Sequence, residues 1–123
     1  SVLFRHMALN YVQIAGLSGA LAIGMGAFGA HGLKGKVDEN GIKVWNTAAQ
    51  YHLAHSVALL ALGLGEKQLS TTARAYGPPL MIGGMVLFSG SLYALVLTGI
   101  KPLGAVTPVG GMALIGGWLS LVR

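Results

Sequence analysis

Two histidines three residues apart, His52 and His55, are the side chains of this sequence best suited to chemistry. They lie in an apolar run, and their spacing places both on one face of a helix. Such a pair can bind a metal ion, with His31 as a third ligand if its own segment packs alongside. The apolar runs contain no acidic residue and the chain contains no cysteine, so the usual ligand sets are incomplete. The sequence therefore favours neutral histidines that hydrogen-bond across helices and predicts no metal or other cofactor, with proton or solute handling as a further interpretation.

Two amide side chains, Asn46 and Gln50, lie four residues apart on a different face of the same segment. They predict either hydrogen bonds to a neighbouring helix or the lining of a polar passage. His31 has the simpler alternative of lying at the water interface, at the end of its apolar run. The candidate polar cluster therefore comprises His31, Asn46, Gln50, His52 and His55.

No catalytic motif emerges from the sequence, and we expect that the protein is not an enzyme. The glycines of Gly24-x-Gly26-x-x-Gly29 match the dinucleotide-binding pattern in spacing only, because they lie in an apolar helix and join no strand to a helix. A Ser-His-Asp set is not credible either, since the only acidic residues, Asp38, Glu39 and Glu66, fall in polar connections.

The elements that position these residues are visible as windows without charge. Only 9% of the residues are charged, against about 25% in soluble domains, and 54% are hydrophobic. Each window holds the roughly 20 residues that a helix needs to cross a bilayer. Backbone polar groups must be paired in lipid, so each window is expected to be either a helix or part of a barrel. The windows span 6–33, 44–65, 75–100 and 102–122. They lack the alternation of a barrel strand, so we predict an all-α integral membrane four-helix bundle in one domain, 1–123.

The expected helices run from about 9–29, 42–64, 78–98 and 103–121. An even number of spans places both termini on the same side of the membrane. Asp38 or Asn40 is expected to cap the second helix. Pro78 and Pro79 fit the first turn of the third helix, and Pro108 fits either the first turn of the fourth or a kink.

Small residues at four-residue spacing predict where helices approach one another closely. In the first helix they form one row through positions 16, 20 and 24, with a second row through position 26. In the last helix they lie at positions 113 and 117. The predicted packing residues are Gly16, Ala20, Gly24, Gly26, Ala113 and Gly117.

The net charge of +5 comes from cations that flank the spans. The eight Lys and Arg residues are spread over short connections, so they form no basic face for nucleic acid. Four cations fall on each side of the predicted bundle, and the positive-inside rule therefore gives no orientation. The chain does not begin with methionine, and we expect removal of either one methionine or a targeting peptide.

Three stretches together carry a family resemblance. They are Gly26-Ala27-Phe28-Gly29-Ala30-His31-Gly32-Leu33, then Val44-Trp45-x-Thr47-Ala48-x-Gln50-Tyr51-His52 with His55, and finally Thr107-Pro108-x-Gly110-Gly111 with Gly116-Gly117-Trp118. Over nearly its whole length the chain resembles the transmembrane protein 256-like family (domain of unknown function 423). The resemblance implies a four-helix membrane protein without an established activity or assigned functional residues. It also implies a mitochondrial inner membrane location, because some eukaryotic members are associated with mitochondria, or otherwise a bacterial-type plasma membrane.

Small size, short connections and close-packing faces lead us to expect a structural or accessory subunit of a larger membrane assembly. A respiratory complex of the mitochondrial inner membrane is the expected setting, with the lipid bilayer and other membrane subunits as partners. The alternative is a small oligomeric transporter or channel that uses the polar side chains of the second helix, Asn46, Gln50, His52 and His55.

Overall fold

The computed structural model describes residues 10–122 of the chain, and helices fill most of this range. Helix α2 (Tyr11–His31) and helix α3 (Glu39–Leu64) form the first two rods, followed by a short 3-10 turn, Glu66–Gln68. The third rod joins α4 (Thr71–Met85), a π-helical segment (Val86–Gly90) and α5 (Ser91–Thr98). The fourth rod consists of a 3-10 segment (Lys101–Ala105), α6 (Thr107–Leu119) and a final 3-10 turn (Ser120–Val122). The predicted all-α four-helix class is confirmed, while the expected start of the first helix at position 9 lies outside the described residues.

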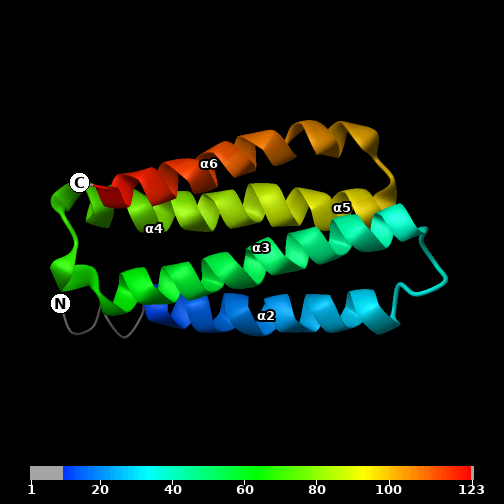
Figure 1. Ribbon diagram of the computed structural model, residues 1–123, viewed down its shortest axis with the longest axis horizontal. Helices are drawn as coiled ribbons and strands as arrows, with labels where there is room; N and C mark the ends of the chain where they lie inside the picture. The colour runs from blue at the N-terminus through cyan, green and yellow to red at the C-terminus, as the bar shows by residue number, and fades with distance from the viewer. Residues whose placement is uncertain (1–9, 123) are drawn as a thin grey trace.

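The four rods run antiparallel in sequence order (Figure 1). Helix α2 packs along α3, and α4 packs along α6, while α3 also contacts α4, the π-helical segment and α5. Helix α3 is therefore the inner element that joins the two halves of the bundle. The described chain begins and ends at the same end of the bundle, as an even number of rods requires (Figure 1).

Side-chain caps set the starts of the first three rods. Asn10 and Gln13 form a reciprocal capping box at the start of α2. Asp38, rather than Asn40, caps α3 by accepting a hydrogen bond of 2.7 Å from the backbone N–H of Gly41. Because the cap is at position 38, α3 begins at Glu39, earlier than the expected start near residue 42.

The expected start of the third helix at Pro78 was wrong. Ser70 caps α4 through the backbone N–H of Ala73 at 3.1 Å, so the helix begins about two turns before the prolines. Pro78 and Pro79 therefore lie inside the helix. Gly77 relieves part of the strain, because the residue before a proline is pushed from helical geometry partly by its own Cβ atom.

The turn after the third rod depends on glycine. Gly99 caps α5 with a φ angle of 71°, in the left-handed region that side chains with a Cβ avoid. A 3-10 segment then follows, so regular α-helix resumes at Thr107 and not near residue 103 as expected. Pro108 lies in the first turn of α6 and makes no kink.

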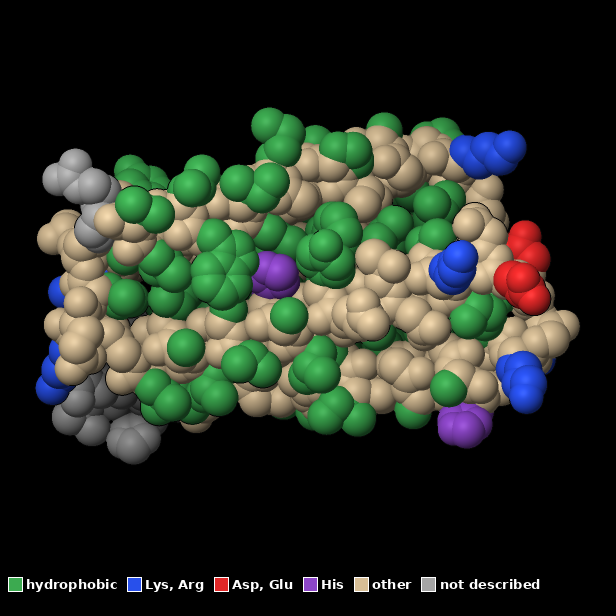
Figure 2. Space-filling model, in the orientation of Figure 1, with side chains coloured by type: hydrophobic (Ala, Val, Ile, Leu, Met, Phe, Trp, Pro, Cys, Tyr) green, Lys and Arg blue, Asp and Glu red, His purple; other side chains and the backbone are tan. Residues whose placement is uncertain are grey.

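The surface of the bundle has the charge distribution of a membrane protein. Charged side chains gather at the two ends, and the face between them carries hydrophobic and uncharged polar groups (Figure 2). Three stretches, Tyr11–His31, Thr71–Thr98 and Lys101–Val122, are long and apolar enough to cross a membrane. Helix α3 is less apolar, but it runs between α2 and the third rod over the same span (Figure 1). We conclude that the protein is an integral membrane four-helix bundle with α3 as its innermost helix.

Two clusters of buried side chains hold the rods together. One lies nearer the described chain ends and is built from Ala15, Leu59, Leu62, Met81, Met85 and Leu114. The other lies toward the α2–α3 connection and is built from Leu33, Trp45, Ala48, Ala49 and Tyr93. The buried polar side chains of α3, His52, His55 and Ser56, lie between the two clusters.

Candidate functional site

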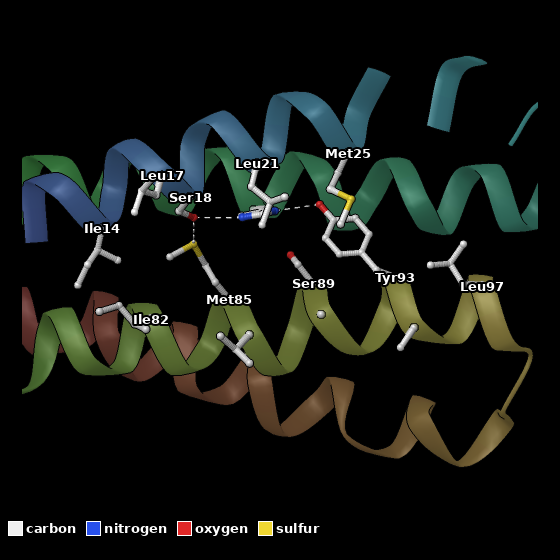
Figure 3. A pocket seen from close by; sticks show the side chains of 14 residues that line it. Ile14, Leu17, Ser18, Leu21, Met25, Ile82, Met85, Ser89, Tyr93 and Leu97 are labelled. Carbon is white, nitrogen blue, oxygen red and sulfur yellow. Dashed lines mark hydrogen bonds between the residues drawn. The ribbon is translucent and has the colours of Figure 1, made fainter. Parts of the chain in front are cut away.

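A row of hydrogen-bonded polar side chains crosses the interior of the bundle at His52. The Nδ1 atom of His52 lies 3.0 Å from the hydroxyl oxygen of Tyr93 in α5. Its Nε2 atom lies 3.1 Å from Oγ of Ser18 in α2, and Ser18 Oγ lies 2.6 Å from Oγ of Ser56 in α3. We call these four residues the polar row; it joins three of the four rods, and Figure 3 shows the part of it from Ser18 to Tyr93.

The carbonyl at one end of the polar row fixes the direction of every proton in it. Ser56 donates its hydroxyl proton to the backbone carbonyl of His52 at 2.8 Å. Ser18, whose hydroxyl also lies 3.6 Å from the sulfur of Met85, then donates to the closer oxygen of Ser56, so that Nε2–H of His52 donates to Ser18 and Tyr93 donates to Nδ1. His52 is thereby held as the neutral Nε2–H tautomer, and hydrogen bonds aligned in one direction strengthen one another.

A groove opens beside the polar row, between α2 and the third rod. Its volume is about 630 Å³, and Ser18, His52, Ser89 and Tyr93 supply its polar lining (Figure 3). Side chains from both rods form its apolar walls: Ile14, Leu17 and Leu21 from α2, and Ile82, Val86 and Leu97 from the third rod. A lipophilic molecule placed there would contact apolar walls and a small set of polar atoms, the usual composition of a binding site.

The π-helical segment Val86–Gly90 is held in place by its neighbours on both sides. Ser89 donates a hydrogen bond of 2.7 Å to the backbone carbonyl of Ala48 in α3. On the other side, Gly110 of α6 lies directly against the backbone of Leu87 and Phe88. Because the Ser89 side chain binds the backbone of α3 and Gly110 of α6 lies against the backbone of the segment, the position of the segment in the bundle is sharply defined.

His55 lies one helical turn from His52 but belongs to a different contact. Its Nδ1–H donates to the carbonyl of Tyr51 at 2.8 Å, since a carbonyl can only accept. Its Nε2 atom accepts from the indole N–H of Trp118 at 3.0 Å. Both ring nitrogens are therefore engaged within the protein, and His55 is neutral in this arrangement.

The structure gives no support to a histidine metal centre in residues 10–122. This part of the chain contains no group of three His, Asp or Glu side chains that could hold a metal ion. Although α2 packs along α3, His31 is exposed at the end of α2. The lone pairs of the imidazoles of His52 and His55 are used in hydrogen bonds. The idea of His31 as a third ligand was therefore wrong.

The five residues of the candidate polar cluster are not brought together. His52 and His55 are buried, each with 7% of its surface exposed. Asn46 and Gln50 are exposed on the outer face of α3, and His31 is exposed at the end of α2. The structure therefore separates two internal histidines from two external amides, and they do not form one common lining.

The predicted packing positions also divide. Gly117 is buried, and a Cβ atom there would lie 3.3 Å from the sulfur of Met81, whereas Ala113 is half-buried. In α2, however, the row through Gly16, Ala20 and Gly24 is exposed. A Cβ atom at either glycine of this row, or at Gly26, would meet no atom within 4 Å. Within the described residues that row therefore packs against no other helix, because α2 turns Ala15, Ala22 and Gly29 inward instead.

Several residues that build the site were missed in the sequence. They are Ser18, Ser56, Ser89, Tyr93 and Trp118, each of which makes a hydrogen bond to another rod or to a site histidine. The available signal was the presence of hydroxyl and indole groups in the middle of spans without charge, where an unpaired polar group is costly. Sequence position alone could not pair them, since Ser18 and His52 are 34 residues apart.

Replacing His52 by Leu tests the polar row. Leucine removes both ring nitrogens at similar size and leaves the Tyr93 hydroxyl without its acceptor. We expect a loss of about 2 kcal/mol in the free energy of unfolding in detergent micelles, because buried groups lose their partners. His31→Leu is the control, with an expected change below about 0.5 kcal/mol at an exposed position. Equal effects of the two changes would show that the polar row does not stabilise the bundle.

The fold and the charge distribution define this chain as a small integral membrane protein with four helices and a polar row inside. Comparison with known proteins then gives the family. A family model described as "Protein of unknown function (DUF423)" matches residues 25–111. The chain belongs to this family, which is the transmembrane protein 256-like family that the sequence motifs indicated.

Relatives of similar length support this assignment. UPF0382 membrane protein YwdK of Bacillus subtilis is 42% identical over 113 residues, covering 91% of this chain and 92% of the relative. UPF0382 membrane protein SAB0533 of Staphylococcus aureus is 43% identical over 112 residues, covering 91% of each. No solved structure matches the chain.

Proposed function

We propose that this protein is a structural or accessory subunit of a larger membrane assembly, and that a partner helix covers the outer face of α3. The observation that carries the proposal is the exposure of Asn46 and Gln50 on that face. Each amide has donors and an acceptor to satisfy, and neither makes a hydrogen bond from its side chain within residues 10–122.

Depth in the membrane makes the exposure of Gln50 costly. At 1.5 Å per residue, Gln50 lies about 16 Å from the start of α3 at Glu39, well inside a hydrocarbon core about 30 Å thick. An amide in an apolar environment without a partner costs about 1–3 kcal/mol by mutational measures. A neighbouring protein helix removes that cost by supplying a hydrogen-bonding side chain or backbone group.

The exposed row of small residues in α2 adds a second surface that suits a partner helix. Gly16, Ala20 and Gly24 leave the backbone of α2 open, and nothing lies within 4 Å of a Cβ atom at either glycine. Small residues at four-residue spacing allow close backbone approach between membrane helices. Two outward faces suited to protein contact on so small a bundle favour a subunit role.

The relatives favour a bacterial-type plasma membrane as the setting of this assembly. The matched proteins YwdK and SAB0533 come from Bacillus and Staphylococcus and carry the name membrane protein. The mitochondrial inner membrane and its respiratory complexes, expected from the family resemblance, gain no support from these relatives. We therefore propose the bacterial setting first, and the identity of co-purifying subunits would test it.

The alternative function, transport by an oligomer, has weaker support in the geometry. Its candidate lining is split, because His52 and His55 bond inside the bundle while Asn46 and Gln50 face outward. A passage lined by several copies could use only the two amides. A complex made of this chain alone would favour that alternative.

The experiment separates complexes from native membranes by size after mild solubilisation. We expect the wild-type chain to migrate with other subunits, far above its own mass of 12.6 kDa. The double variant Asn46→Leu, Gln50→Leu should migrate alone, because it lacks both amides of the outer face. The control is Met112→Leu, Ile115→Leu, which alters two exposed apolar side chains of α6 and should leave the complex intact.

Two outcomes would contradict this proposal. Migration of the wild-type chain as a free protein would show that it is not a stable subunit of a larger complex. Equal migration of the amide variant and the wild type in a large complex would show that the outer face of α3 is not the contact. Variants that reach the membrane at wild-type levels are required for the comparison, and quantitative immunoblotting of the membrane fraction provides that check.

A further inference from the structure

We propose that the groove between α2 and the third rod binds one neutral lipophilic molecule whose head is a hydroxyl group, such as a long-chain alcohol or phenol. The hydroxyl would donate its proton to an oxygen of the groove lining, while the chain would lie between the apolar walls. All the residues concerned belong to one chain. The inference is therefore independent of the accessory-subunit proposal.

The size and lining of the groove suit one ligand of this kind. Its volume of about 630 Å³ lies within the range of 300–1,000 Å³ that is common for small-molecule sites. Leu17 and Leu21 of α2 line one side of it, and Val86 and Leu97 of the third rod line the other. These side chains are more than half exposed in the bundle itself, so an occupant gains contact with all of them.

The hydrogen-bonding capacity of the lining selects the head group. The hydroxyl protons of Tyr93, Ser18 and Ser89 are all committed, to His52, to Ser56 and to the carbonyl of Ala48 respectively. Both nitrogens of His52 are also engaged. The three oxygens keep lone pairs, so the lining offers acceptors and no free donor. A ligand that donates is matched, whereas an ether or ketone oxygen finds no partner.

The depth of the polar row excludes a charged head group. His52 lies 13 residues after Glu39 and 12 residues before Leu64, which is roughly 18–20 Å from either end of α3. A phosphate or carboxylate would have to leave the water interface to reach it, and the groove lining contains no cation to compensate. A neutral hydroxyl on an apolar chain can reach this depth and needs no cation beside it.

The π-helical segment is a separate observation at the same place. Val86, Ser89 and Gly90 all line the groove, and π-helical turns inside α-helices occur frequently at functional sites. Gly90 has open space around the position of a Cβ atom, so its backbone forms part of the wall. The irregular turn therefore shapes the groove where the hydroxyl acceptors lie.

The test uses the purified protein in phosphatidylcholine nanodiscs with radiolabelled 1-dodecanol, and empty nanodiscs as the blank. Dodecyl methyl ether, which has the same chain without the donor, competes at equal mole fraction in the bilayer. We expect saturable binding of the alcohol and a threefold to tenfold weaker affinity for the ether, about the effect of one hydrogen bond. Equal affinities, or no binding above the blank, would overturn the proposal.

A matched pair of glycine variants locates the site. Gly90→Leu places a side chain in the groove, whereas Gly83→Leu adds the same side chain on the same rod away from the groove lining. A Cβ atom at either glycine meets no atom within 4 Å, so both variants are expected to fold. We expect at least a tenfold loss of dodecanol binding in the first and wild-type binding in the second. Equal binding by the two variants would place the ligand elsewhere and refute the proposal.

Discussion

Alanine at Gly110 is expected to disrupt the bundle, whereas alanine at the neighbouring Gly111 is expected to be tolerated. A Cβ atom at Gly110 would lie 2.6 Å from the carbonyl carbon of Leu87 and 2.8 Å from Cα of Phe88. These are backbone atoms of the π-helical segment, which Ser89 also ties to α3. Neither the backbone of α6 at Gly110 nor that of the π-helical segment can shift locally to make room for the added methyl group. Helix α6 would therefore have to move away from the third rod.

The size of this effect follows from the cost of overpacking. Extra methyl groups in a packed interior typically cost about 1–3 kcal/mol, and we expect Gly110→Ala to reach the upper end or exceed it. At Gly111 the nearest atoms are in the ring of Phe88, at 3.6 and 3.8 Å, which is ordinary contact. Alanine there should be neutral or slightly stabilising, because it favours helix over glycine.

Unfolding by sodium dodecyl sulfate in mixed micelles, followed by circular dichroism, measures both glycine variants. The expected result is an early or absent transition for Gly110→Ala and a wild-type transition for Gly111→Ala. If the two variants unfold together, α6 does not approach the π-helical segment as closely as the structure shows.

The second large effect is expected at Trp45, the most enclosed aromatic side chain of the bundle. Its exposure is 0%, and its ring packs against Phe28 and Tyr93 at centroid distances of 5.6 and 4.6 Å. The indole N–H donates to the carbonyl of Met25 at 2.6 Å. Gly29 makes room for this ring, since a Cβ atom there would lie 2.7 Å from the indole nitrogen. Replacement by alanine removes all these contacts and leaves a cavity at the α2–α3 interface.

Burial predicts how much stability the bundle loses when each of the two tryptophans of the chain is replaced by alanine. Removing a buried Trp typically costs about 3–5 kcal/mol, and we expect about 3 kcal/mol for Trp45→Ala, because burial from lipid, unlike burial from water, adds no hydrophobic term to the stability. Trp118 is 49% exposed and donates one hydrogen bond to His55. Trp118→Ala should cost about 1 kcal/mol. The same detergent titration compares the two, and a larger loss at Trp118 would contradict the assignment of the core.

The four helices could be read from the sequence because the bilayer imposes a simple rule. Charge is excluded from spans of about 20 residues, and the windows without charge therefore marked the rods. The error at the third rod has a local cause. The prolines at positions 78 and 79 signalled a helix start more strongly than Ser70, although Gly77 lets the helix pass through them.

The face that each helix turns inward was much harder to predict. In α2 nearly every position is apolar or small, so the pattern does not separate lipid-facing residues from buried ones. Small residues occur on both faces, so the spacing favours the row through Gly16 and Gly24, whereas the structure buries Ala22 and Gly29. In a membrane an apolar side chain is stable both against lipid and against another helix. The composition of a span therefore says little about which of its faces is turned toward the other helices.

Only the histidines of the site could be predicted from the sequence, and their hydrogen-bond partners could not. His52 and His55 stood out because imidazoles are rare in apolar spans, and their partners did not, since serine and tyrosine are unremarkable in sequence. Tyr93 reaches His52 from a helix 41 residues away in the chain. Only the packing of the third rod against α3 brings the two together.

The π-helical segment also sets the direction in which the second half of the third rod faces. A π-helical turn holds one residue more than the α-helical turn it replaces, and each residue rotates a helix by about 100°. Met81 and Met85 before the segment and Tyr93 after it all face the interior with that extra residue in place. A deletion of one residue within 86–90 would restore a uniform α-helix and leave Tyr93 directed toward His52, whereas a uniform α-helix through all the residues of 86–90 would turn Tyr93 by about 100° away from it. In this family, a one-residue gap at these positions would therefore indicate a regular third rod that keeps the polar row.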